Sequence, residues 1–234
     1  MTERHSTIAS TATAAHPGAA VGSNALGSNA VLRNTYRLLS MTLAFSAVVA
    51  LTSAALRLPA PGLLLTLGGF FGLLFLTQYL RNSAWGLVSV FALTGFMGYT
   101  IGPMLGAYLA LANGPALVAT AMGTTAVAFL GLSMYARSER AVDMSRYGTF
   151  LIIGILTAFC LGLAAVFFSL PGLALAVSGL FVLFMCGLIM FETQNIIRGG
   201  ETNYIMATVT LFVSIYNLFT SLLHLFGAFA GEDA

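Results

Sequence analysis

The sequence predicts an all-α integral membrane protein with seven transmembrane helices, arranged as three hairpins around a central seventh helix. Composition is the first reason for this prediction. Of the 234 residues, 59% are hydrophobic and 7% are charged, whereas about 25% of residues are charged in soluble domains. The mean hydropathy of +0.95 agrees. The second reason is that apolar runs long enough to cross about 30 Å of hydrocarbon recur seven times along the chain.

The first 30 residues predict a disordered cytoplasmic tail, and residues 31–234 predict the seven-helix membrane domain. The tail contains 8 Ala, 4 Ser, 4 Thr and 3 Gly without apolar periodicity, so it lacks the surface to offset the entropy of ordering. The first apolar run starts near Leu38. Its length of about 19 residues exceeds the hydrophobic region of a signal peptide, so we interpret it as a spanning helix.

Seven spans follow one another with short connections, which predicts that successive helices are antiparallel neighbours. Three alternate connections contain Pro beside Gly, a pair that suits a tight turn in which Pro starts the next helix. The predicted spans are residues 38–56, 63–80, 85–109, 115–136, 147–169, 173–197 and 204–230.

Arginine counts predict the orientation, because cytoplasmic loops of membrane proteins keep positive charge. One side of the predicted bundle collects eight arginines, and the other side has only Arg57. The amino terminus is therefore expected in the cytoplasm. After an odd number of crossings the carboxyl terminus, with Glu232 and Asp233, is expected in the periplasm.

Polar residues recur along the last predicted helix at steps of 4, 3, 4 and 3. At about 100° per residue they fall within an arc of about 80°, so they form one polar face. Such a face avoids lipid and predicts that the helix is surrounded by the hairpins. Two interpretations stay open, hydrogen bonds that hold the bundle together or a polar, hydrated path. The stripe consists of Thr210, Ser214, Asn217, Ser221 and His224.

Glu192 is the only acidic residue well inside a predicted span. A carboxyl group within the membrane is a functional candidate by default. If it is buried it would act as a proton sensor or an ion gate, whereas hydration at the interface would leave it an ordinary anion. Both interpretations remain open, and an ion pair with a nearby arginine is compatible with either.

Small residues mark one face of the third predicted helix, at Gly98, Gly102 and Gly106, and Pro103 interrupts the same stretch. Glycines four residues apart let helix backbones approach closely, while proline removes a backbone hydrogen bond and kinks the helix. We interpret these residues as packing and kink positions. The alternative is an interrupted helix that lines a substrate site, as in some transporters.

Several functional classes are excluded by what the sequence lacks. The chain has no Lys, which excludes a P-loop nucleotide site and Schiff-base chemistry. A net charge of +2 is too small for nucleic-acid binding. No metal-ligand cluster or cofactor motif is present. A rhomboid-like serine protease would need Ser133 and His224 on one level, but they are expected near opposite membrane faces, so we predict no catalytic residue and no enzyme.

Many spaced positions resemble the Bax inhibitor 1 (TMBIM) family. The family's extended signature is matched by Gly86-Leu87-Val88-Ser89, Gly98, Ile101-Gly102-Pro103, Leu105, Ala110, Leu117-Val118, Ala121, Thr125-Ala126 and Phe129. Further residues resemble the bacterial YccA branch, which modulates the protease FtsH. These are Val31 to Tyr36, Phe191-Glu192-Thr193, Asn195-Ile196-Ile197, Gly199 to Ile205 and Tyr216-Asn217.

This resemblance implies a bacterial inner-membrane protein with a central seventh helix that binds the FtsH protease complex and restrains its attack on other membrane proteins. The wider family implies an alternative, a pH-sensitive calcium leak controlled by two carboxylates, with Ca²⁺ or H⁺ as the ligand. The first carboxylate position corresponds to Glu192 and the second to Ser214, with Asn217 close by in the stripe. Because Ser214 carries no charge, the resemblance predicts a weakened leak.

Overall fold

The computed structural model describes residues 17–232, and this part of the chain consists of helices and connections without strands. Seven of the helices contain an apolar span of at least 18 residues, so the predicted fold class is confirmed for the described range. The elements are α1 (Pro17–Ala55), α2 (Leu63–Leu80), α3 (Trp85–Leu109), α4 (Gly114–Ala136), η1 (Met144–Tyr147), α5 (Gly148–Phe167), α6 (Pro171–Ile197) and α7 (Tyr204–Glu232).

The structure differs from the sequence prediction at the start of α1. This helix begins at Pro17, so residues 17–30, which were expected to be disordered, are helical. Proline suits the first helical turn and alanine has the highest helix propensity. Extending an existing helix also avoids the cost of nucleation. The predicted tail residues 1–16 lie outside the described residues, and the division at residue 30 stays a prediction.

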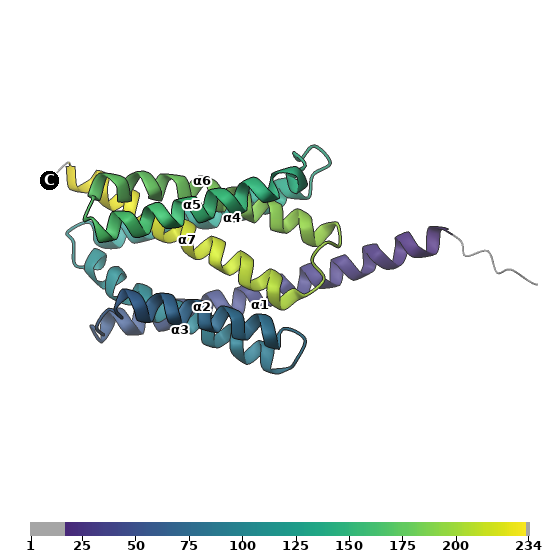
Figure 1. Ribbon diagram of the computed structural model, residues 1–234, viewed down its shortest axis with the longest axis horizontal. Helices are drawn as coiled ribbons and strands as arrows, with labels where there is room; N and C mark the ends of the chain where they lie inside the picture. Colours follow the sequence, from purple (N-terminus) through teal and green to yellow (C-terminus); the bar gives the residue numbers. More distant parts are fainter. Residues whose placement is uncertain (1–16, 233–234) are drawn as a thin grey trace, which may run out of the picture.

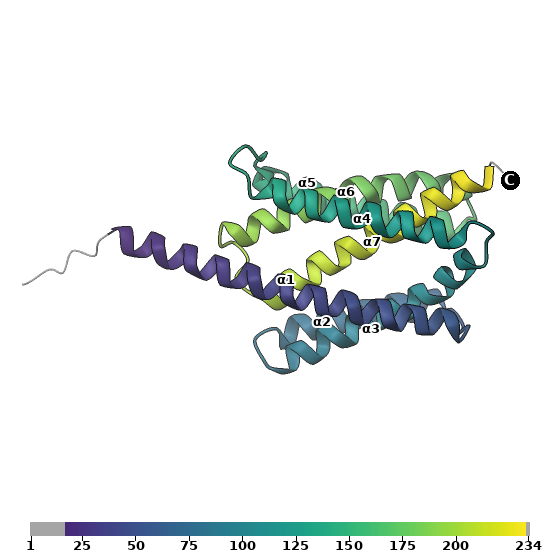
Figure 2. The same ribbon diagram turned by 180° about the vertical axis from the view of Figure 1, so that it is seen from behind.

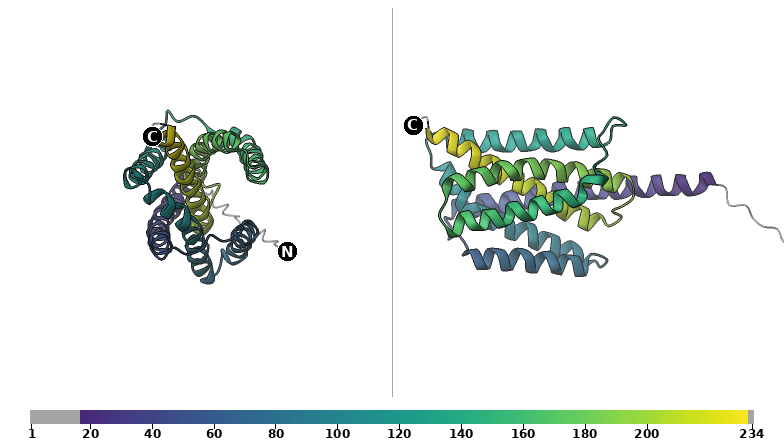
Figure 3. Two further views of the ribbon diagram at one scale, coloured as in Figure 1. Left: turned by 90° about the vertical axis from the view of Figure 1, so that its left-hand side faces the viewer. Right: turned by 45° about the horizontal axis from the view of Figure 1, so that its top comes forward.

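The helices form two layers, α1 to α3 on one side and α4 to α6 on the other, and α7 runs obliquely between them (Figure 1). The end-on view in Figure 3 places α7 in the middle of the bundle. Helix α7 packs against α1, α3, α4 and α6, and its span has the largest buried share of the seven, 61%. These contacts agree with the central position expected from the polar stripe.

Neighbours along the chain are not always neighbours in space. Helix α3 packs on α4 and α5 packs on α6, as expected for hairpins, but α1 packs mainly on α3. Helix α2 packs on the same helix, so α3 lies between the first two helices. The prediction that every short connection makes a packed pair is therefore wrong for α1 and α2, and also for α4 and α5.

Glycines on α3 explain why α1 lies there. A Cβ atom at Gly98 would lie 2.5 Å from the backbone oxygen of Ser46, and one at Gly102 would overlap the side chain of Ser53. Only glycine permits this approach of two backbones. Gly106 has more room, because its nearest neighbour, Ala54, would be 3.7 Å from an added Cβ atom.

Pro103 contributes to the same interface through the hydrogen bond that it cannot make. Proline has no N–H, so the carbonyl of Tyr99, four residues earlier, has no donor within α3. The Ser53 hydroxyl of α1 donates to this carbonyl oxygen at 3.2 Å. Ser53 is 1% exposed, so the bond lies in the interior and compensates for the proline. The last turns of α3 then bend toward α4 (Figure 2).

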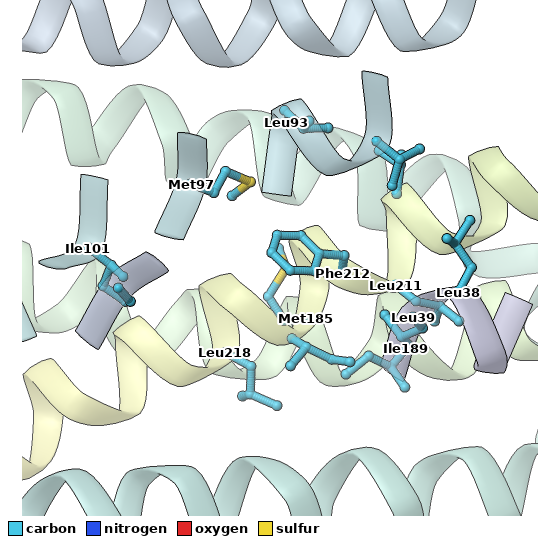
Figure 4. Close-up of a cluster of buried hydrophobic side chains, with 14 of the residues drawn as sticks. Leu38, Leu39, Leu93, Met97, Ile101, Met185, Ile189, Leu211, Phe212 and Leu218 are labelled. Carbon is cyan, nitrogen blue, oxygen red and sulfur yellow. The ribbon is translucent and has the colours of Figure 1, made fainter. Parts of the chain in front are cut away.

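The apolar core surrounds the middle of α7. Figure 4 shows Phe212 of α7 among Leu93 and Met97 of α3 and Met185 of α6, and all four side chains are buried. This cluster joins the two layers through α7.

Candidate functional site

The two ends of the bundle differ in charge. The connections α2–α3, α4–α5 and α6–α7 gather at one end with the start of the α1 span, and we call it the basic end. Among the described residues Arg57 is the arginine at the opposite end, and the basic end holds Arg33, Arg37, Arg81, Arg137, Arg140, Arg146 and Arg198. Arg4 lies outside the described residues.

The polar stripe of α7 lines two cavities instead of one continuous channel. Toward the opposite end, Asn217, Ser221 and His224 line a cavity of about 360 Å³ between α3, α5, α6 and α7. Toward the basic end, Thr210 lines a cavity of about 410 Å³ with Gln78 of α2.

Ser214 separates these cavities. Its side chain is fully buried, and its hydroxyl donates to the carbonyl oxygen of Thr210 at 2.7 Å. The hydrogen-bond donor of Ser214 is therefore satisfied within α7. The middle of the polar stripe is therefore buried between packed helices, while the two ends of the stripe line the two cavities.

His224 has a partner that the sequence did not predict. Its Nδ1 lies 2.8 Å from the hydroxyl of Ser178 on α6, and this hydroxyl also donates to the carbonyl oxygen of Ala174 at 3.0 Å. Ser178 stands alone in an apolar run, so no sequence pattern marks it. The pair joins α6 to α7 beside the 360 Å³ cavity.

Glu192 lies in the last two turns of α6 and is 5% exposed. The side chain of Asn195 and the like-charged Glu201 are its polar neighbours. Glu192 is thus buried, and its role as a proton sensor or ion gate stays a prediction. Arg198, the next arginine along the chain, forms an ion pair with Asp143.

A polar clasp joins the α4–α5 connection to the end of α6. The Gln194 amide nitrogen donates to the carbonyl oxygen of Val142 at 2.8 Å, and its oxygen accepts from the backbone N–H of Met144 at 2.9 Å. Arg198 donates to Asp143 and, at 2.6 Å, to Ser145. The Ser145 hydroxyl and N–H, together with Arg198, lower the pKa of Asp143 to about 2.

Asn203 ties the α6–α7 connection to the other layer. Its amide nitrogen donates to the carbonyl oxygen of Arg81 and to the side chain of Asn82, both at 3.0 Å. Its side-chain oxygen caps α7 by accepting the N–H of Ile205 at 3.0 Å. The α6–α7 connection therefore holds both layers together at the basic end.

The remaining residues singled out from the sequence lie where two helices pack together. Gly98, Gly102, Pro103 and Gly106 belong to the α1–α3 interface, and none of them lines the two cavities along α7. Within residues 17–232 no group of three or more His, Cys, Asp or Glu side chains could hold a metal ion.

Three buried hydroxyl groups in the described part of the chain are left without a hydrogen bond. Among the described residues the hydroxyls of Thr35, Tyr36 and Ser133 have no hydrogen-bond partner. Ser133 lies near the basic end of α4, while His224 lies in the half of α7 at the opposite end of the bundle. The two residues are therefore far apart along the bundle, as expected from the sequence.

These features define a multi-pass membrane protein of seven helices with a central, polar seventh helix. The family described as "Inhibitor of apoptosis-promoting Bax1" matches residues 28–231. The chain therefore belongs to the Bax inhibitor 1 family, as the spaced residues of the sequence predicted.

Relatives in several bacteria cover nearly the whole chain. It is 54% identical to an uncharacterized protein of Pseudomonas aeruginosa over 87% of this chain and 91% of that protein. It is 51% identical to the modulator of FtsH protease YccA of Escherichia coli over 89% of this chain and 94% of that protein. An uncharacterized membrane protein of Vibrio cholerae is 41% identical over 89% of this chain.

Proposed function

We propose that this protein resides in the bacterial inner membrane, binds the membrane protease FtsH and restrains the degradation of membrane proteins. The observation that carries this proposal is the 51% identity to the E. coli modulator of FtsH protease, which extends over 94% of that protein. A relationship of this extent includes the membrane domain and its connections, so a shared partner is the simplest common property.

The proposed orientation places the basic end in the cytoplasm and the carboxyl terminus in the periplasm, because arginine is retained on the cytoplasmic side. Alkaline phosphatase fused after Ala234 should then be active. A silent phosphatase with a bright cytoplasmic fluorescent reporter at the same position would contradict this orientation.

The amino-terminal part of α1 is the segment that we propose for contact with the protease. It extends past the other helices at the basic end (Figure 1), and residues 17–28 precede the apolar span that begins at Asn29. A segment outside the bundle can be gripped without unfolding the spans.

Deletion of the residues before Val31 tests this role. The shortened protein should keep its melting temperature in detergent but recover less FtsH when it is purified from native membranes. Arg57→Gln, at the opposite end, is the matched control and should recover as much FtsH as the wild type. Loss of the melting transition, or unchanged recovery of FtsH, would contradict the proposed role of the segment.

A non-enzymatic role completes the proposal. The relatives are named as a modulator or as uncharacterized proteins. Within residues 17–232 no histidine lies at the level of Ser133 in the bundle, because His224 is in the opposite half of α7. A serine-reactive fluorophosphonate should therefore leave the purified protein unlabelled, and covalent labelling would contradict this part.

A cation leak is the alternative, and two observations favour it. Glu192 is buried within a span, and the polar face of α7 borders two cavities at different depths. Ser214 lies between these cavities without a charge, so we expect slow calcium flux in liposomes, with Ser214→Asp making it more strongly pH dependent. Brisk flux that Glu192→Gln leaves unchanged would remove Glu192 from this role.

A further inference from the structure

Helices α1 and α4 border a lateral groove. Both pack against α7, but they do not form a packed pair with each other, and Figure 2 shows α7 between them. The groove has a volume of about 320 Å³ and an apolar lining. Its walls include Ala47 and Leu51 of α1 and Met122 and Ala126 of α4, and its floor includes Phe212 and Phe219 of α7.

A polar cluster lies between the same two helices at the basic end. The guanidinium carbon of Arg137, which directly follows α4, lies 5.2 Å from the centre of the Tyr36 ring of α1. Ser133 is four residues before Arg137 and therefore on the same face of α4. Phe129 continues this contact, with its ring centre 5.8 Å from that of Tyr36.

Both hydroxyl groups in this cluster lack an acceptor. Those of Tyr36 and Ser133 are buried without a partner among the described residues, and Ser133 is 2% exposed. A guanidinium group supplies only donors, so Arg137 cannot accept the O–H proton of either hydroxyl. Two hydroxyl donors beside a cation are suited to an oxyanion. The carbonyl groups at the end of α4 repel an anion, so the binding must depend on Arg137.

We propose that the α1–α4 groove binds one anionic phospholipid from the leaflet at the basic end. The phosphate contacts Arg137, Tyr36 and Ser133, and an acyl chain lies in the apolar groove. Eleven residues separate Ala126 from Arg137, which is about 16 Å along α4 and within the length of a long acyl chain. The basic mouth and the apolar walls match the two halves of such a lipid.

Native mass spectrometry of the full chain, purified free of lipid and then mixed with phosphatidylglycerol or phosphatidylcholine, tests this site. The wild type should retain one phosphatidylglycerol in clear preference to phosphatidylcholine. Arg137→Gln should lower phosphatidylglycerol retention about tenfold, because a charged hydrogen bond is lost. Tyr36→Phe and Ser133→Ala should each lower it about threefold to tenfold. Arg140→Gln, three residues from Arg137, is the control and should retain lipid like the wild type.

The groove is tested separately. Ala126→Trp fills it and should lower the retention of both lipids, whereas Val127→Trp changes the adjacent residue outside the groove lining and should not. Met122→Trp repeats the test from a second position if Ala126→Trp lowers the melting temperature.

Three results would overturn the proposal. The first is an unchanged preference for phosphatidylglycerol in Arg137→Gln. The second is equal retention by the folded groove variants and the Val127→Trp control. The third is a lipid-free dimer of the wild type that the groove variants dissociate, since a second copy of the chain would then occupy the groove.

Discussion

The two sides of α1 meet their neighbours in different ways. Toward α3, glycines bring the backbones together, and the carbonyl oxygen that Pro103 leaves free accepts a hydrogen bond from Ser53. Toward α4, a groove separates the helices, and the hydroxyls of Tyr36 and Ser133 have no partner among the described residues. On the α3 side the Ser53 hydroxyl and the Tyr99 carbonyl satisfy each other, whereas on the α4 side two described hydroxyls have no partner.

This difference distinguishes an interface that packs two helices together from a surface that can bind a ligand. A satisfied and closely packed interface stabilises the fold, and its residues need no ligand to explain them. Buried hydroxyls without partners cost free energy, so their position beside a groove indicates a surface that is completed by another molecule. Variants of the two sides should therefore change stability in opposite directions.

The largest expected effect is that of Gly98→Val. The new Cβ atom would lie 2.5 Å from the backbone oxygen of Ser46, so α1 and α3 must separate. We expect the free energy of unfolding in detergent to fall by about 3 kcal/mol. Gly123→Val is the control, because a Cβ atom at Gly123 has no neighbour within 4 Å. An equal loss in both variants would show that the α1–α3 interface is not specially close.

Ser53→Ala should have the next largest effect. Its removal leaves the Tyr99 carbonyl oxygen without a donor, which should lower the free energy of unfolding by about 1 to 3 kcal/mol. Adding Pro103→Ala restores an N–H within α3, so the double variant should lose less than the sum of the two single variants. Strictly additive losses would mean that Ser53 does not compensate for Pro103.

Tyr36→Phe should change stability in the opposite direction. Without lipid, removing a buried hydroxyl that has no partner should raise the free energy of unfolding by about 1 kcal/mol. Ser133→Ala should act in the same way from the side of α4. The measurement is the unfolding of delipidated protein in detergent. A loss of stability in both variants would show that the two hydroxyls do form hydrogen bonds within the protein.

The smallest expected effect concerns the clasp at the basic end. Hydrogen bonds from Ser145 and Arg198 lower the pKa of Asp143 to about 2. The ionised carboxylate therefore stabilises the folded clasp fully at pH values above the unfolded pKa of about 3.9. This stabilisation is lost as the pH falls through about 2, so the clasp should be unchanged between pH 7 and pH 5. Asp143→Asn should speed trypsin cleavage in the α4–α5 connection at neutral pH without altering the melting temperature. An unchanged cleavage rate would show that the ion pair does not restrain this connection.

Much of the fold could be predicted because hydropathy and composition act locally along the chain. The predicted spans 63–80, 85–109 and 204–230 agree with the spans of the structure. The 3.6-residue period likewise placed the polar stripe of α7 toward other helices, and the buried Ser214 and Ser221 agree with that prediction.

The pairing of helices could not be predicted, because it depends on how two surfaces fit. Short connections suggested that α1 packs on α2, but the glycines of α3 provide the closer fit. The bond from Ser53 to Tyr99 joins residues that are 46 positions apart. Sequence spacing also cannot show that Ser178 reaches His224, or that the hydroxyls of Tyr36 and Ser133 lack partners in the described part of the chain.

The central claim, that the protein restrains FtsH, is tested most directly by reconstituting the chain with FtsH and a membrane-protein substrate in liposomes. The quantity to measure is the rate at which ATP-dependent degradation removes the substrate. If the chain restrains FtsH, this rate falls as the amount of the chain increases and recovers when the residues before Val31 are deleted. A rate that is the same with and without the full-length chain would contradict it.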